Sequence, residues 1–202
     1  MSGLFCNSHD PCALERQMQQ PPSYKPRGQG IYIVGRIDWR SRGNYAEIVD
    51  CIISRMQMTQ LKKRAEEVFA KETEEQIFRN RDHRKRFYDV LAIKRGNSHV
   101  SSCYAAALFL LSADQALWQR VHENVLDNGI YYDRVRLGGV DLEQYILFHA
   151  AKDVYSGTKH IRLSELADRE LISDEILRLI LGAFVIEQCG MNILEQEVSD
   201  ED

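Results

Sequence analysis

The residues with the clearest capacity for metal chemistry lie near the N-terminus, where Cys6, His9 and Cys12 occur at three-residue steps. Zinc is held by four protein ligands in structural sites, or by three ligands and a water in catalytic ones. The rest of the sequence holds no second Cys/His cluster to complete such a set. We therefore expect free thiols in this segment and no bound metal, with a zinc site as the alternative.

Motifs for covalent or cofactor chemistry are missing from the sequence. It contains no Gly-x-Ser-x-Gly motif and no phosphate-binding P-loop pattern. Gly28-x-Gly30 precedes the predicted strand, the wrong order for a dinucleotide-binding loop. His122 and His149 stand among apolar residues, which predicts histidines hydrogen-bonded in the core. The sequence thus predicts no catalytic residue, no metal and no cofactor, and hence a protein that is not an enzyme.

The sharpest charge feature is a run of cations followed by Phe87 and Tyr88. Interleaved cations and aromatic rings can bind phosphates and stack on bases. The run contributes Arg79, Arg81, Arg84, Lys85 and Arg86, and a second patch contributes Arg36, Trp39, Arg40 and Arg42. We predict these residues as the surface that binds a partner or a nucleic acid. The alternative is a solvated helix face that pairs with acidic residues elsewhere in the chain.

The net charge of −4 is unevenly divided along the 202 residues. Residues 1–95 hold 18 Lys and Arg against 12 Asp and Glu, a net of +6, whereas residues 96–202 hold 8 against 18, a net of −10. Such a division favours either a basic face that meets an acidic partner or two halves that neutralise each other.

Residues 163–180 have the spacing of a helix-turn-helix. Leu171 stands where the turn usually has glycine, and the second helix would carry Arg178 as its single cation near two acids. Because acids at that helix end would repel phosphates, we favour an ordinary packed helical pair.

The first part of the chain predicts one strand and then helices. Residues 1–30 contain all four prolines and read as a flexible or surface-draped segment, and residues 31–39 are the best strand candidate. The partner strand would be residues 159–163 or lie in another chain. No Gly or Pro occurs over residues 44–95, which favours helices near 43–57, 59–80 and 81–94, the last two forming separate helices or one long polar one.

The second part predicts a helical core. The run 104–111 is apolar on all sides and should form a central helix. Further helices are expected over 113–127, from Asp141 to about 155, from Ser164, and from Ser173 to near Gly190. The fold class is therefore mainly α: a helical bundle core with a short N-terminal β-strand or ribbon and a long polar helix. The expected divisions are residues 1–30, a basic strand-plus-helix extension at 31–95, an acidic helical core at 96–195, and an acidic tail at 196–202.

Composition indicates the cellular setting. The longest apolar run is shorter than the roughly 20 residues of a membrane helix, and no signal-peptide pattern begins the chain. Five scattered cysteines do not form a disulfide framework. We expect a soluble cytoplasmic protein that contacts no membrane.

The C-terminal half resembles a group of small uncharacterised helical proteins of Firmicutes and their phages and mobile elements. Residues 83–91, 105–112 and 171–177 carry this resemblance. It implies a bacterial, phage or mobile-element origin and brings no known activity with it. Together these observations predict an adaptor or inhibitor that binds another protein or a nucleoprotein, for instance a phage inhibitor of a host defence nuclease. The alternative is a nucleic-acid-binding protein that uses the basic N-terminal half.

Overall fold

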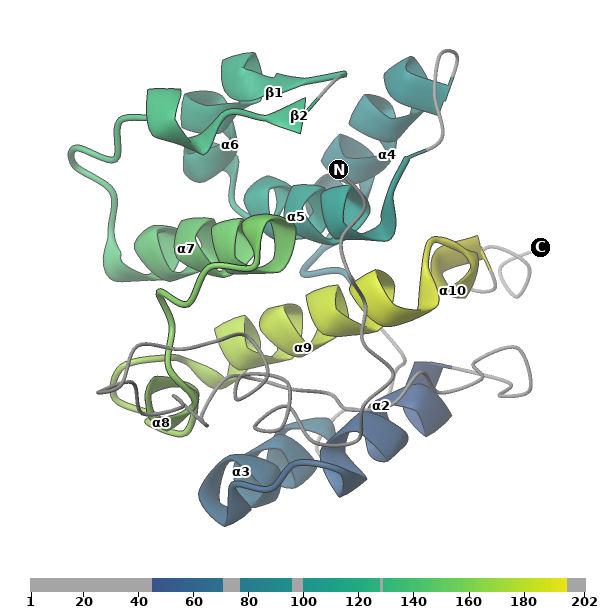
Figure 1. The fold of residues 1–202 in the computed structure, drawn as a ribbon, viewed down its shortest axis with the longest axis vertical. Coiled ribbons are helices and arrows are strands. Elements are labelled where there is room, and N and C mark those ends of the chain that lie inside the picture. Colours follow the sequence, from purple (N-terminus) through teal and green to yellow (C-terminus); the bar gives the residue numbers. More distant parts are fainter. Residues whose placement is uncertain (1–44, 71–76, 96–99, 128, 196–202) are drawn as a thin grey trace, which may run out of the picture.

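The computed structural model describes residues 45–70, 77–95, 100–127 and 129–195, and these are mainly helical (Figure 1). The α-helices are α2 (Tyr45–Ser54), α3 (Thr59–Ala70), α4 (Arg81–Arg95), α5 (Ser102–Ser112), α6 (Gln115–Val121), α7 (Leu142–Ser156), α8 (Leu163–Leu166), α9 (Asp174–Cys189) and α10 (Asn192–Glu195). Two 3₁₀ turns, η2 (His122–Asn124) and η3 (Tyr132–Arg134), flank a hairpin of β1 (Val125–Leu126) and β2 (Gly129–Ile130).

The core is built around α5, which packs against both α7 and α9. Every residue from Tyr104 to Ser112 is buried, as expected of a helix that is apolar on all sides. Ser101 is the N-cap of this helix, since its Oγ accepts a hydrogen bond from the backbone N–H of Tyr104 at 3.3 Å. The predicted central helix is confirmed.

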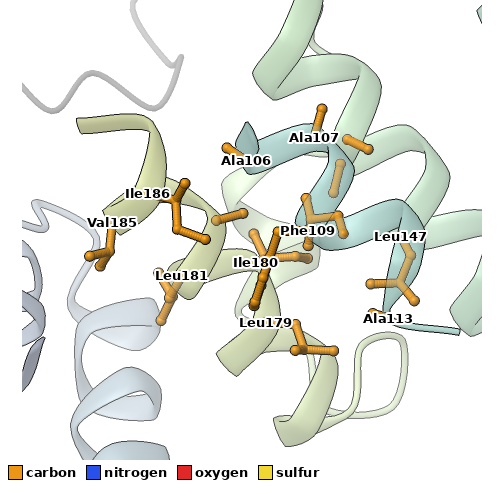
Figure 2. Packing of buried hydrophobic residues seen from close by; sticks show 14 of the residues in the cluster. Ala106, Ala107, Phe109, Ala113, Leu147, Leu179, Ile180, Leu181, Val185 and Ile186 are labelled. Carbon is orange, nitrogen blue, oxygen red and sulfur yellow. The ribbon is translucent and has the colours of Figure 1, made fainter. Parts of the chain in front are cut away.

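Helix α9 is the second central element, and it lies between α5 on one side and α2 and α3 on the other (Figure 1). Ten of its residues are buried. Figure 2 shows Ile180 facing Phe109 of α5, whereas Leu181 and Val185 lie on the side away from Phe109. Ser173 caps its start, as predicted. Since α2 and α3 cover α9, one hydrophobic cluster contains residues from both sides of the predicted boundary at residue 95.

Helix α7 has well-defined ends. Asp141 Oδ1 accepts from the N–H of Gln144 at 2.8 Å, and Gln144 Oε1 accepts from the N–H of Asp141 at 3.3 Å. Gly157 ends the helix at φ +65°, a left-handed conformation that glycine adopts without strain. This turn directs residues 158–162 back past the end of α7.

The structure corrects several predicted elements. The helix expected over 113–127 ends at Val121, because the β-branched Val125 pairs with Ile130 in the hairpin. Gly129 is required there, since a Cβ would lie 2.8 Å from the hydroxyl of Tyr155. The helix expected over 59–80 is described only to Ala70, and residues 77–80 form a turn, which excludes one continuous helix with α4.

The predicted strand at 159–163 is also wrong, because residues 158–162 form an irregular segment and α8 begins at Leu163. The predicted strand at 31–39 and the segments 1–30 and 196–202 lie outside the described residues. In the part of the chain that the structure describes, no helix has both the length and the apolar character needed to cross a membrane.

Candidate functional site

The structure describes only part of the predicted basic surface. Arg36, Trp39, Arg40 and Arg42 lie outside the described residues. The run from Arg79 to Arg86 occupies the turn before α4 and the first turns of that helix. Its five cations and His83 have different environments.

Arg79 joins the start of α4 to the starts of α7 and α9. Its Nε and Nη2 donate to the two carboxylate oxygens of Glu175, both at 3.0 Å, and Nη2 also lies 3.4 Å from Glu143. Partial burial alone would lower the pKa of Arg79, but the hydrogen bonds and charges of Glu175 and Glu143 raise it above its ordinary value. Arg79 therefore stabilises the packing of the start of α4 against α7 and α9.

Arg86 plays a similar part at the end of α5. Its Nε donates to the carbonyl of Ser112 at 2.9 Å, and Nη1 donates to Gln115 Oε1 at 2.9 Å. Carbonyl groups at a helix C-terminus lack hydrogen-bond partners within the helix. A guanidinium there donates to them and also interacts favourably with the negative end of the helix dipole. Partial burial lowers the pKa of Arg86 from its ordinary value.

His83 is completely buried between these two arginines. Its Nδ1 accepts a hydrogen bond from the backbone N–H of Arg79 at 3.0 Å, and its Nε2 lies 2.8 Å from the carbonyl oxygen of Phe109. A carbonyl can only accept, so Nε2 carries the proton and the ring is neutral. Burial, partly opposed by the Phe109 bond, lowers the pKa of His83 to about 3. The histidine thus fixes the turn before α4 onto α5.

The remaining cations of the run differ from these. Arg81 and Lys85 are exposed and lie one turn apart on α4, while Arg84 is half-buried. Asp82 and Asp89 are exposed on the same helix and reduce its local positive charge. The open basic surface on α4 is therefore much smaller than the sequence pattern suggests.

The helix-turn-helix spacing belongs to a packed helical pair. Arg64 of α3 is 3% exposed at its side chain and enters the α8–α9 connection. It donates to the carbonyls of Leu166 at 2.7 Å, Asp168 at 3.0 Å and Ile172, and to Asp174 at 3.0 Å. Because α9 is buried among other helices, it cannot enter a DNA groove. The interpretation as an ordinary helical pair is confirmed.

Helix α7 carries a second group of candidate binding residues, two of which are exposed and apolar. Leu142 and Tyr145 are 51% and 48% exposed, and His149 follows one turn after Tyr145. Spacings of three and seven residues place all three on one side of the helix. We call Leu142, Tyr145 and His149 the α7 face. Its rings are in contact, since the centroids of Tyr145 and His149 lie 4.3 Å apart.

The segment after Gly157 adds a second histidine beside the α7 face. The ring of His160 lies 4.7 Å from that of His149, with an angle of 39° between the planes. The Nδ1 of His160 is 2.7 Å from Asp153 Oδ1. Asp153 also accepts from Thr158 Oγ1 at 2.7 Å and from the N–H groups of His160 and Ile161 at 2.8 and 3.0 Å.

Electrostatics define the protonation states around Asp153. Its burial would raise its pKa, but the backbone N–H groups of His160 and Ile161 and the side chains of His160 and Thr158 lower it overall, so it is a stable carboxylate. Burial first, and then the neighbouring His160, lowers the pKa of His149. The Nδ1 of His149 is buried and finds no hydrogen-bond partner among the residues described. The expectation of a core histidine with satisfied hydrogen bonds is therefore wrong, and His122, exposed at the end of α6, is not a core residue either.

The cysteines behave as small apolar residues within the described ranges. Cys51 is buried, and Cys103 and Cys189 are half-buried free thiols. Burial and the nearby Glu187 raise the pKa of Cys103, and they raise that of Cys189 to about 12. Thiols in this state are weak nucleophiles. Cys6, His9 and Cys12 lie outside the described residues.

Sequence reasoning did not find the α7 face or its link to Asp153 and His160. The sequence predicts the end of this helix near residue 155, but a helix end does not say which residues the following segment will contact. In the comparisons, no family model matches the chain, and neither a curated protein nor a solved structure is significantly similar to it.

Proposed function

We propose that this protein acts by binding another protein, without chemistry of its own, through the α7 face. The observation that supports this proposal is the exposure of Leu142 and Tyr145 side by side, since single exposed apolar residues are common but adjacent ones often form an interface. Tyrosine is enriched at interfaces because it combines a large apolar ring with a polar end.

The spacing of the α7 face indicates the kind of partner. Anchors at positions i, i+3 and i+7 are those of a helix that lays one side into an apolar groove. The partner would therefore present a hydrophobic groove that accepts Leu142 and Tyr145. Burying the exposed half of Tyr145 removes roughly 100 Å² from water and stabilises a complex by about 2.5 kcal/mol.

The test compares variants in the native host. Wild type, Leu142→Ser/Tyr145→Ser and the control Leu126→Ser are expressed at native level, and co-purifying proteins are quantified. Leu126 is 41% exposed on the hairpin, so the control substitution removes a similarly exposed apolar side chain at a position outside α7. We expect one protein to be recovered with wild type and Leu126→Ser but not with the double variant. The purified partner should then bind the double variant at least tenfold more weakly.

The proposal fails if every co-purifying protein is recovered equally with the double variant while circular dichroism shows all three chains folded. A nuclease among the variant-sensitive partners would support the inhibitor role that we expect from the sequence.

Direct nucleic-acid binding is a second candidate, favoured by the exposure of Arg81 and Lys85 one turn apart on α4. Phosphate contacts weaken steeply as salt rises. If this candidate is right, Arg81→Ala/Lys85→Ala should lower affinity in a mobility-shift titration and flatten its salt dependence. If that variant binds nucleic acid as tightly as wild type, Arg81 and Lys85 do not form the binding surface and this candidate function loses its support.

A further inference from the structure

We propose that His149 and His160 together bind a divalent transition-metal ion, Zn²⁺, Ni²⁺ or Cu²⁺, beside the C-terminal half of α7. The two imidazoles supply two ligands, and water or donor atoms from another molecule fill the remaining positions. This site goes beyond the proposed protein contact and can be tested without any partner.

The separation of the two rings suits a shared ion. A metal lies 2.0–2.1 Å from an imidazole nitrogen, and hence about 3.2 Å from the ring centroid. Two imidazoles that meet at tetrahedral or octahedral angles on one ion then have centroids about 4.5 to 5.2 Å apart. The observed separation between His149 and His160 is 4.7 Å, with the planes inclined at 39°.

His160 is oriented as metal-binding histidines usually are. Such residues generally hydrogen-bond through their second ring nitrogen to a carboxylate, which fixes the ring and makes the ligand more basic. Asp153 holds Nδ1 of His160 at 2.7 Å, leaving Nε2 for an ion. Asp153 is itself fixed by Thr158 and by two backbone N–H groups, and its side chain is only 16% exposed.

His149 supplies the independent observation. Its buried Nδ1 has no hydrogen-bond partner in the described part of the chain, and such an atom calls for an explanation, a bound ion being one. The ring of Tyr145, 4.3 Å away, restricts the movement of His149.

The ligand types select the class of metal. Imidazole nitrogen suits zinc, nickel and copper, whereas magnesium and calcium prefer oxygen ligands, and the oxygens of Asp153 are already engaged in hydrogen bonds. Within residues 45–70, 77–95, 100–127 and 129–195, no group of three His, Cys, Asp or Glu could hold a metal. The two imidazoles are therefore the protein ligands of the proposed ion.

The experiment is a calorimetric titration of the full chain with zinc chloride and nickel chloride. Cys6→Ser/His9→Ala/Cys12→Ser forms the background, because that motif carries competing metal ligands. We expect one saturable site in the background chain. His149→Ala and His160→Ala should each weaken it at least tenfold, and Asp153→Asn should weaken it about 10- to 100-fold.

His122→Ala is the matched control, since it removes an exposed histidine from another part of the surface. It should leave the metal affinity unchanged. A second readout guards against misfolding: zinc should raise the melting temperature of the background chain but not that of folded His160→Ala. The proposal is overturned if the background chain binds neither ion, or if His149→Ala and His160→Ala bind as tightly as His122→Ala.

Discussion

His83 should make the stability of this protein depend on pH in a defined window. The unfolded chain takes up the imidazole proton near pH 6.5, whereas burial lowers the folded-state pKa to about 3. Between these values the unfolded state binds the additional proton, so the free energy of unfolding decreases as the pH falls. Stability from this residue is fully present above pH 6.5 and is lost progressively down to pH 3.

The size of the effect follows from the two pKa values. Each pH unit inside the window costs about 1.4 kcal/mol, which gives about 3 kcal/mol at pH 4.5 and about 4 kcal/mol at pH 3, where half of the folded chains are already protonated. A loss of this order is a large fraction of the 5–15 kcal/mol that typically stabilises a domain. We therefore expect His83 to contribute strongly to acid unfolding.

The assay is urea unfolding of wild type and His83→Gln at pH 7.0 and 4.5. Glutamine cannot titrate and can keep a donor toward the carbonyl of Phe109, although the N–H of Arg79 loses its acceptor. The variant should be less stable at pH 7.0 by about 1–3 kcal/mol. Its stability should then fall between the two pH values by about 3 kcal/mol less than that of wild type.

His122→Gln serves as the control, because it removes an exposed imidazole that does not join α4 to α5. The reasoning about His83 is refuted if wild type and His83→Gln lose the same free energy between pH 7.0 and 4.5. It is equally refuted if the His83 ring resonances titrate above pH 5 in the folded protein.

Three further predictions concern residues that hold the helices together. Arg64→Met removes every hydrogen-bond donor that this side chain provides to the α8–α9 connection. It should lower the free energy of unfolding, measured by urea denaturation, by about 3–5 kcal/mol. The control Lys63→Met, which changes an exposed neighbour, should alter that free energy by at most about 0.5 kcal/mol. A double-mutant cycle on Arg79 and Glu175 should give a coupling of about 0.5–1 kcal/mol that decreases with added salt, and additive single variants would contradict the ion pair. Gly157→Ala should cost about 1–2 kcal/mol by thermal unfolding because of its positive φ, while Gly138→Ala, with open space around it, should be nearly neutral; equal effects would refute the strain argument.

Helix starts and the central helix could be predicted because the information is local. Asp141 and Ser173 each accept a hydrogen bond from the backbone N–H three residues ahead, so their type and position suffice. The apolar run of α5 needs only its composition to indicate burial on all sides. The end of α6 could not be predicted this way, because the pairing of Val125 with Ile130 outweighs the helical pattern.

The candidate sites depend on contacts that no local pattern contains. Arg79 meets Glu175 across 96 residues, and Arg86 meets Ser112 across 26. A count of cations in the run cannot say which of them face inward. His160 reaches His149 only because Gly157 reverses the chain and Asp153 captures the backbone that follows.

The same contacts change how the uneven charge of the chain is to be understood. Arg64 and Arg79 come from the basic half, and they bind Asp174, Glu175 and Glu143 of the acidic half. Part of the division is therefore neutralised within the molecule, as one of the two initial interpretations predicts. Since an ion pair that holds the fold is not free to attract a partner, the charge pattern alone is weak support for a basic docking surface. Leu142 and Tyr145 of α7 are exposed and take part in none of these ion pairs, so variants of that face are the more decisive test of binding.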